Sequence, residues 1–373
     1  MSIDAGQSLR TDVLVIGAGQ AGLAAAHALE AAGIAFLIVD ASPAVGDSWR
    51  NRYDGLTLFT PRSISALPGM PLVGDPDGYA TKDEFAEYLA RYAAKNSYGV
   101  ISATKIVKLL RVGRLFEAFT ADGLMITSRA VIVATGSFPV PRIPALSRFV
   151  PVSVDQLHVA DFQGAYSIAD GAVLVVGDGA SGRDVALSLS ATHRVLLAGG
   201  RKRRLLPEWI LGRNVWWWLD RFGLLRASAN SFIGRRIREA DPFPRRGNDD
   251  QSLARTGVIR RPRLTEIDGG MVVFEDASRE VVRTIVWATG YVDDFRWIEI
   301  EGATGRNGDA IHSGGVSPVD GLYFVGRPWQ RNRASGLIAG VGDDASFVVD
   351  HLRRHGEQGV APPGATPCPR RGR

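Results

Sequence analysis

Two glycine-rich loops of the same pattern, far apart in the sequence, constrain this chain more than any other feature. The first loop, at residues 17–22, lies between an apolar run at 12–17 and an alanine-rich segment at 21–32, and a second apolar run follows at 35–40. Short runs of β-branched residues are typical of buried parallel strands. The sequence therefore predicts a strand–helix–strand unit that turns on Gly-x-Gly-x-x-Gly, in the arrangement that binds a dinucleotide.

Each glycine of the first loop has its own task. Gly17 permits the tight turn, Gly19 lets a pyrophosphate approach the backbone, and Gly22 lets the helix pack on the strand. The helix opens with Gln20 and Ala21, where free N–H groups and the helix dipole favour phosphate. A purely structural glycine turn is the alternative, but the strand, helix, second strand and a following acid all stand in register.

The same pattern returns in the second half of the chain. An apolar run at 172–177, a helical segment at 181–190 and another apolar run at 193–198 predict a second strand–helix–strand unit. Its cofactor-binding positions are Gly177, Gly179, Ala180, Ser181 and Gly182. The chain therefore holds two dinucleotide-binding units.

The two units differ in charge where a ribose would lie. In the first, Asp40 ends the second strand and can accept hydrogen bonds from ribose hydroxyls. In the second, the equivalent position is Gly200, and a basic run follows in place of an acid. A carboxylate repels a 2′-phosphate, whereas guanidinium groups bind it, so we expect NADPH here rather than NADH, with Arg201 and then Arg203 as ligands. A solvated basic turn is the other interpretation.

Two later strands, at 130–136 and 284–290, end in the same Ala-Thr-Gly tripeptide, and a last strand at 321–326 precedes a helix at 343–354. This order indicates an α/β protein with two Rossmann-like domains, in which the second, the NADPH domain, is inserted into the first. The predicted parts are 1–163 and 288–358 for the first domain, 164–287 for the second with a Trp-rich helical insertion, and a disordered tail at 359–373.

Composition excludes several other classes. The single cysteine, Cys368, rules out an intramolecular disulfide and a redox-active Cys-x-x-Cys pair. No apolar run reaches the ~18 residues of a membrane span, and the N-terminus lacks the features of a signal peptide, so we expect a cytoplasmic protein. The net charge is +5, but no nucleic-acid motif accompanies it, and no His/Cys cluster has metal-ligand spacing.

Residues 209–238 combine Trp216, Trp217 and Trp218 with several arginines. One interpretation is a set of helices that cap the NADPH domain and line a substrate entrance. The other is a basic, Trp-rich helix that lies on a membrane surface or forms a homodimer face. Core or interface packing explains tryptophan more often, so peripheral membrane contact is the lesser alternative.

The segment at 45–53 resembles the Gly-Gly-x-Trp-x-x-x-x-Tyr stretch of flavin-containing monooxygenases. Residues 58–61 and 78–83 resemble the segments that follow it in that family, and the likeness runs from about residue 11 to 355. It is closest to short bacterial members described as FAD/NAD(P)-dependent oxidoreductases. The resemblance implies FAD at the first loop. The further cofactor-binding residues that it implies are Ser48, Trp49, Arg50, Thr60, Ala134, Thr135, Gly136, Ala288, Thr289, Gly290, Tyr291 and Gly326.

In related two-dinucleotide flavoproteins the start of the final helix points at the flavin pyrimidine ring. Gly340 precedes that helix here, and the helix dipole would stabilise an anionic reduced flavin. The family fingerprint falls on Val152, Val154, His158 and Phe162, and only the last two match it. We therefore expect His158 to be a linker histidine in a domain hinge. The Asn that larger members place beside the flavin has no clear counterpart at 60–70.

The resemblance implies an NADPH-dependent monooxygenase that acts on a small amine, sulfide or ketone through a flavin C4a-hydroperoxide formed with O₂. Because the flavin carries the chemistry, we expect no catalytic protein nucleophile and no metal. An NADPH-dependent reductase or oxidase without oxygen insertion is the first alternative. A nucleotide-sensing regulatory flavoprotein, docked to a membrane transporter through 209–238, is the second. The oligomeric state stays open, and a homodimer is common for such enzymes.

Overall fold

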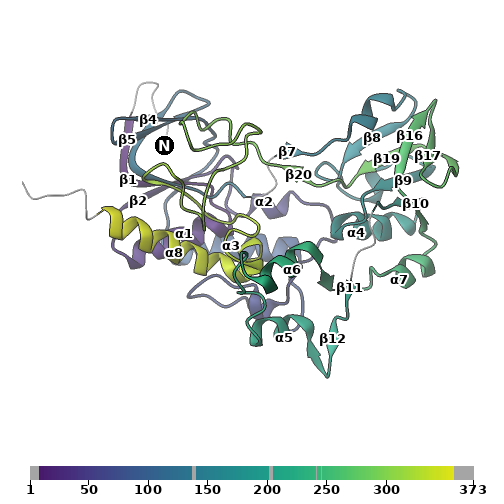
Figure 1. Ribbon diagram of the computed structural model, residues 1–373, viewed down its shortest axis with the longest axis horizontal. Coiled ribbons are helices and arrows are strands. Elements are labelled where there is room, and N and C mark those ends of the chain that lie inside the picture. The colour runs from purple at the N-terminus through teal and green to yellow at the C-terminus, as the bar shows by residue number, and fades with distance from the viewer. Residues whose placement is uncertain (1–7, 137–139, 201–204, 241, 245, 357–373) are drawn as a thin grey trace, which may run out of the picture.

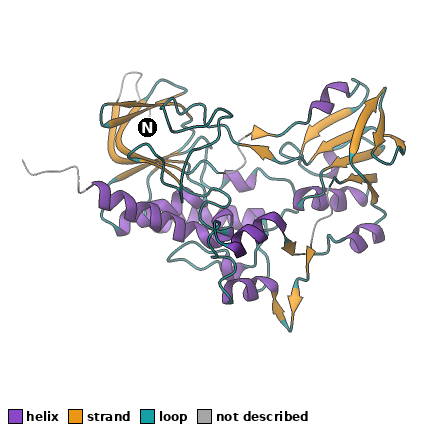
Figure 2. Ribbon diagram, viewed as in Figure 1, coloured by secondary structure: helices purple, strands orange, loops and turns teal. Residues whose placement is uncertain are grey.

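The computed structural model describes residues 8–136, 140–200, 205–240, 242–244 and 246–356. They form two lobes, each built around one β-sheet, with helices beneath and between the lobes in the view of Figure 1. Figure 2 shows that the longer helices lie on the lower side of the sheets in that view, whereas a short helix lies above the strands of the second lobe.

The first lobe contains a seven-stranded sheet. Its strands in spatial order are β3 (Val100–Ile101), β2 (Phe36–Val39), β1 (Ser8–Ile16), β6 (Met125–Val133), β5 (Leu115–Thr120) and β4 (Ile106–Val112), and β21 (Leu322–Phe324) also pairs with β6. Strands β3, β2, β1, β6 and β21 pair with their neighbours in parallel. Strand β5 pairs antiparallel with both β6 and β4. The long helices that bury their apolar faces in this lobe are α1 (Gln20–Ala31), α3 (Lys82–Lys95) and α8 (Ile338–Gly356). The short elements near them are α2 (Asp47–Arg50), η1 (Arg62–Ile64) and η4 (Arg333–Gly336).

The second lobe contains a five-stranded parallel sheet. Its order is β15 (Ile259–Arg261), β10 (Arg194–Ala198), β9 (Ala172–Val176), β19 (Thr284–Trp287) and β8 (Asp155–His158). One face packs on α4 (Ala180–Ser190) and α7 (Asp250–Arg255), and the other on the antiparallel strands β16 (Leu264–Asp268), β17 (Met271–Phe274) and β18 (Arg279–Val281). The short helices of this lobe are η2 (Ala145–Phe149) and η3 (Ala165–Ser167).

The strands of the second sheet lie in sequence between β6 and β21 of the first, which confirms the predicted α/β fold with two dinucleotide-binding units. Two connecting segments run between the lobes and pair with each other as β7 (Val140–Pro141) and β20 (Tyr291–Val292). The exact boundaries at 163, 287 and 358 stay predictions. Strand β8 lies before residue 163 in the sequence, but it belongs to the second sheet because it pairs with β19.

The Trp-rich insertion packs differently from the expected cap on the second lobe. It comprises β11 (Leu205–Leu206), β12 (Trp209–Ile210), β13 (Arg213–Asn214), α5 (Val215–Arg221), α6 (Phe232–Ala240) and β14 (Phe243–Pro244). Trp216 is 2% exposed and packs in a cluster with Phe59, Ala334 and Leu337 of the first lobe. The first lobe presents an apolar surface at these positions, and this accounts for the placement.

The final helix also differs from the expectation, since α8 begins at Ile338 rather than near residue 343. Gly340 therefore lies inside its first turn. A Cβ on Gly340 would meet the Ala334 carbonyl oxygen at 2.5 Å, and one on Gly342 would meet Pro68 Cγ at 2.7 Å, so close packing outweighs the low helix propensity of glycine. Among the described residues, no helix has the length and apolar character needed to cross a membrane.

Candidate cofactor-binding site

The first glycine loop joins β1 to α1 with the geometry that the sequence predicts. Gly17 has φ +109°, and an added Cβ there would lie 2.5 Å from the carbonyl oxygen of Ala134. A Cβ on Gly22 would lie only 1.7 Å from the Gly17 carbonyl oxygen. Both positions therefore require glycine, one for the turn and one for the contact between helix and strand.

Gly19, the middle glycine of the loop, faces open space. A Cβ on Gly19 would meet only Ser48 Oγ, at 3.9 Å, and no side chain caps the N-terminus of α1. Asp40 lies beside the loop and accepts hydrogen bonds from the Ala18 N–H (2.6 Å) and the Ser42 N–H (2.7 Å). This arrangement leaves helix N–H groups available to an anion, with a carboxylate one residue beyond β2.

The segment that resembles the flavin-binding stretch forms α2 next to this loop. Gly46 has φ +96° and packs against α3, where a Cβ would meet the Ala86 carbonyl oxygen at 2.4 Å. Trp49 donates its indole N–H to Gln20 Oε1 (3.1 Å), so the segment is tied to the first turn of α1. Arg50 is half-exposed and pairs with Asp47 of the same short helix.

Thr60 does not present a free hydroxyl. Its side chain is 2% exposed, and its Oγ1 lies 2.7 Å from Ser65 Oγ, which also donates to the Thr60 and Pro61 carbonyl oxygens. The hydroxyl therefore holds the turn at η1.

The end of β21 reaches the same loop from the other side. A Cβ on Gly326 (φ +84°) would lie 2.7 Å from Ala21 Cβ, so this strand end approaches the first turn of α1. The next residue, Arg327, is 6% exposed, donates to the Gly136 carbonyl oxygen (2.7 Å) and pairs with Asp293. Arg327 therefore links the end of the first Ala-Thr-Gly segment to the connecting segment that follows the second.

The second loop repeats the geometry of the first. Gly177 has φ +121°, and a Cβ on Gly182 would lie 1.8 Å from the Gly177 carbonyl oxygen. Gly179 begins α4 without a side-chain cap, and Ala180 and Ser181 form the first turn. The two loops therefore present the same uncapped helix start, one in each lobe.

The repeated Ala-Thr-Gly motif is explained by these loops. The Ala134 carbonyl oxygen lies against Gly17, and the Ala288 carbonyl oxygen would be 2.2 Å from a Cβ on Gly177. Each motif therefore follows the strand next to a glycine loop, and its alanine carbonyl packs against the first glycine of that loop. The following glycines, Gly136 and Gly290, both have φ +81°, which turns the chain out of the sheet. Thr135 is exposed, and Thr289 donates its hydroxyl to the Arg142 carbonyl oxygen (2.5 Å).

Positive charge gathers where β10 ends. Arg263 Nε lies 3.1 Å from the position of a Cβ on Gly200, the residue that replaces the acid. Within the loop, Asp178 is buried and pairs with Arg183 and Arg260 (2.6 Å each), so its charge is neutralised. The pairing of β15 with β10 brings Arg260 and Arg263 to this edge, a neighbour relation that sequence alone did not reveal. The predicted ligands Arg201 and Arg203 lie outside the described residues.

A cavity of about 210 Å³ lies where the two lobes meet. Gly55, Thr57 and Phe59 line it from the first lobe, and Ala180, Asp184 and Leu187 of α4 from the second, with Arg246 and Asn248 closing it. Arg246 donates to the Leu58 carbonyl oxygen (2.6 Å) and to Thr57 Oγ1 (2.7 Å). Burial raises the pKa of Asp184 and holds its carboxyl closer to neutrality.

Tyr53, the tyrosine of the family-like stretch, also meets α4. Its hydroxyl hydrogen-bonds with Ser181 and Asp184, and burial raises its pKa well above the ordinary value. The helix that begins the second loop is therefore held against the first lobe by a hydrogen-bonded tyrosine.

His158 lies at the junction of the connecting segments. The Ala160 N–H donates to Nδ1 (3.1 Å), which leaves Nε2 to donate to the Gly290 carbonyl oxygen (3.1 Å). Tyr291 packs edge-on to the ring, and its hydroxyl accepts from Arg52 Nη1 (3.3 Å). Both ring nitrogens form hydrogen bonds with backbone groups at the hinge, as expected of a linker histidine.

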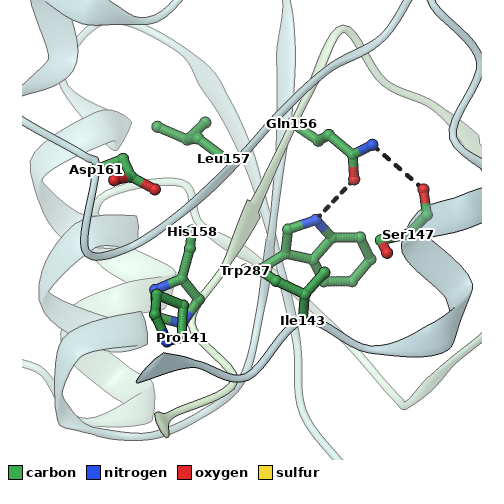
Figure 3. A pocket seen from close by; sticks show the side chains of 8 residues that line it. All are labelled: Pro141, Ile143, Ser147, Gln156, Leu157, His158, Asp161 and Trp287. Atoms are coloured by element: carbon green, nitrogen blue, oxygen red, sulfur yellow. Dashed lines mark hydrogen bonds between the residues drawn. The ribbon is translucent and has the colours of Figure 1, made fainter. Parts of the chain in front are cut away.

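A shallower pocket of about 490 Å³ lies beside this histidine (Figure 3). Trp287 donates to Gln156 Oε1 (3.1 Å), and Gln156 Nε2 donates to the Ser147 carbonyl oxygen (3.2 Å), as the dashed lines show. The amide and indole groups of this pocket are satisfied by each other and by the backbone. We therefore place the candidate site at the two loops and the cavity between them.

We expect His158→Leu to lower the free energy of unfolding by roughly 2 kcal/mol or more, because the Gly290 carbonyl and the Ala160 amide lose their buried partner. Burial lowers the pKa of His158, so the folded form binds fewer protons than the unfolded form below the ordinary pKa of about 6.5. This histidine therefore destabilises the fold as pH falls below that value, and the variant should lose that part of the pH dependence. Urea unfolding at pH 7.5 and 5.5 measures both effects. The exposed His355→Leu is the control, and equal changes in both variants would refute the hinge role.

The residues present fit a dinucleotide at each loop. Each loop combines an open backbone, an uncapped helix and glycines that no other residue can replace, and the two differ in charge at the ribose position.

Comparison with known proteins agrees with this geometry. Residues 14–204 match the family model of pyridine nucleotide-disulphide oxidoreductases. A CzcO-like oxidoreductase of Geobacillus kaustophilus is 41% identical, covering 92% of this chain and 99% of that protein. Indole-3-pyruvate monooxygenase YUCCA1 of Oryza sativa subsp. japonica is 27% identical over 84% of this chain and 86% of its own length. A flavin-containing monooxygenase structure from Stenotrophomonas maltophilia superposes with a TM-score of 0.79 at 22% identity, covering 93% and 99% of the two chains.

The flavin-containing monooxygenase fold that the sequence resemblance implies is therefore confirmed. With its paired glycine loops and its close match to the CzcO-like proteins, the chain belongs to the pyridine nucleotide-disulphide oxidoreductase family and is an oxidoreductase.

Proposed function

We propose that this protein binds FAD at the first loop and NADPH at the second, and that it is a monooxygenase of a small amine, sulfide or ketone that acts through a flavin C4a-hydroperoxide. The observation that carries the proposal is the pair of uncapped loops of opposite charge, Asp40 beside one and Arg263 beside the other. Bound FAD would accept hydride and activate O₂, and the protein would position the partners.

The chain's own residues would hold the cofactors in different ways. At the first loop, Gly19 would admit the pyrophosphate, with Gly17 and Gly22 shaping the turn. Asp40 would bind the ribose, and Ser48 the adjoining part of the cofactor. The cavity between the lobes, with Phe59 and Leu187 on its walls, would shield the reacting groups from water. The names of the relatives, several of which are monooxygenases, support oxygen insertion over simple reduction.

Stopped-flow spectroscopy separates oxygen insertion from the reductase alternative. The protein is reduced with NADPH under anaerobic conditions and then mixed with oxygenated buffer. The proposal predicts a transient absorbance distinct from both oxidised and reduced flavin. Direct return to the oxidised spectrum would favour a reductase or oxidase, and absence of any reduction by NADPH would support a regulatory flavoprotein.

Specificity for NADPH is tested at the end of β10. We expect Arg263→Ala to weaken NADPH by about tenfold or more, the effect of losing one charge-assisted contact to a 2′-phosphate, and to change NADH less than about twofold. Arg201→Ala should act in the same direction. Steady-state KM values for both nucleotides give the comparison, with Arg279→Ala on the exposed strand β18 as control. An equal loss for the two nucleotides would overturn the assignment of the phosphate site.

A further inference from the structure

The insertion ends in an exposed apolar tip that the proposed chemistry does not use. Strands β12 and β13 form a hairpin that turns at Leu211 and Gly212, and β12 lies at the lowest point of the view in Figure 1. Leu211 is 88% exposed and Trp209 is 51% exposed. The side chain of Leu211 is almost wholly uncovered and that of Trp209 is half uncovered, although both are large and apolar.

The tip continues onto α5. Trp218 donates its indole N–H to the Ile210 carbonyl oxygen (2.9 Å), which fixes the hairpin to the helix. Trp217 packs edge-on to Trp218 at 4.7 Å, and Phe222 stacks on Trp218 at 5.8 Å. Because Trp217 and Phe222 are exposed, one continuous apolar surface runs from the hairpin to the end of the helix. We call this surface the tryptophan tip: Trp209, Ile210, Leu211, Trp217, Trp218 and Phe222.

The hairpin turn carries a residue that its backbone disfavours. Leu211 has φ +49° and Gly212 has φ +72°, the left-handed pair in which Asn-Gly is the preferred sequence. A leucine there adds strain without any packing in the folded chain, since its side chain is almost wholly exposed. Selection for folding alone would not place leucine at this turn.

The charges around the tip are basic. Arg213 lies over the Trp217 ring at 5.2 Å, and Arg221 is exposed at the end of α5. The acid on α5, Asp220, pairs with Arg226, so its charge is neutralised. A second copy of the chain docked through the same surface would bring these arginines together, whereas a surface of anionic lipid headgroups would neutralise them.

We infer that the tryptophan tip docks this protein reversibly on an anionic membrane surface. Trp209, Leu211 and Trp217 would enter the interfacial region, and Arg213 and Arg221 would contact lipid phosphates. Tryptophan rings are favoured at that depth, and arginine adds electrostatic attraction. Docking of this kind needs no membrane-spanning helix. A lipophilic substrate would then reach the enzyme from the bilayer.

Vesicle co-sedimentation of the full-length, FAD-loaded protein tests this inference. The protein should bind vesicles of phosphatidylcholine with phosphatidylglycerol more tightly than vesicles of phosphatidylcholine alone, with binding weakened by salt. Leu211→Asn should reduce binding by about tenfold through loss of one buried apolar side chain. This variant creates the favoured Asn-Gly turn, so the hairpin should remain folded. The double variant Arg213→Gln with Arg221→Gln should remove most of the preference for anionic vesicles.

The matched control is Val152→Asn, which removes a fully exposed apolar side chain from a turn of the second lobe. It should bind vesicles as the native protein does, and all variants should keep their FAD and their rate of NADPH oxidation. Absence of vesicle binding at low salt, or an equal loss in the control, would overturn the inference. A dimer in light scattering that Leu211→Asn dissociates would also overturn the inference, because the tip would then be a contact between two copies of the chain. The vesicle result is independent of oxygen insertion.

Discussion

Gly22→Ala should yield a protein that is purified almost without FAD, with less than about a tenth of the native flavin content. The added methyl group would lie 1.7 Å from the Gly17 carbonyl oxygen, so α1 must move away from β1. Neither atom is at the end of a flexible side chain, and overpacking against backbone typically costs about 1–3 kcal/mol or more. The shift also displaces the N–H groups that would hold the pyrophosphate. Flavin absorbance per chain in the purified protein measures the effect.

Gly33→Ala is the matched control for this experiment. Gly33 lies in the same strand–helix–strand unit and also has positive φ (+66°), but no atom lies within 4 Å of an added Cβ. The control should lose about 1 kcal/mol of stability from backbone strain and keep its flavin. If Gly22→Ala folds, as circular dichroism reports, and still binds FAD as tightly as Gly33→Ala, the first loop is not the FAD site.

Gly182→Ala should give the complementary result. It should retain FAD but lose reduction by NADPH, with the apparent second-order rate lower by about 100-fold, as expected for ~3 kcal/mol of lost binding. The geometry is nearly the same as at Gly22, since the added Cβ would lie 1.8 Å from the Gly177 carbonyl oxygen. Only the lobe differs. Anaerobic reduction of the bound flavin by NADPH, followed by absorbance, measures the rate.

The two alanine variants control each other. Reduction with dithionite should proceed normally in Gly182→Ala, which shows that the flavin is intact. If that variant instead loses FAD and keeps its affinity for NADPH, the two cofactors are assigned to the wrong loops. Comparable loss of both cofactors in both variants would show only that the lobes fold together, and the assignment of separate loops would fail.

Much of the fold could be predicted because local pattern and tertiary role coincide at the loops. Gly17 and Gly177 follow buried strands that read as continuous apolar runs, and the two Ala-Thr-Gly strands turned out to close the two loops. Each loop needs a glycine at its first position because the alanine carbonyl of an Ala-Thr-Gly strand lies against it. The antiparallel strands β4 and β5 were not predicted, and the alternation of residues 115–120 between buried and half-buried positions is seen only in the structure.

What depends on contacts between distant segments could not be predicted. Arg263 reaches Gly200 only because β15 pairs with β10, which no local pattern reveals. The insertion was expected to cap the second lobe, but Trp216 packs against Phe59 and Leu337 of the first lobe. Thr60 stays a predicted cofactor-binding residue, and its hydroxyl hydrogen-bonds with Ser65 in a local turn, a contact that no sequence pattern indicated. In each case the residue type indicated the chemistry, and the topology decided the partner.

The most direct measurement of the central claim is the cofactor content and redox response of the purified native protein. The protein should be yellow, release one FAD per chain on denaturation, and lose its flavin absorbance when NADPH is added without oxygen. NADH at the same concentration should act much more slowly. A colourless chain that does not take up FAD on reconstitution, or a flavin that NADH reduces as readily as NADPH, would contradict the account of two loops with opposite charge.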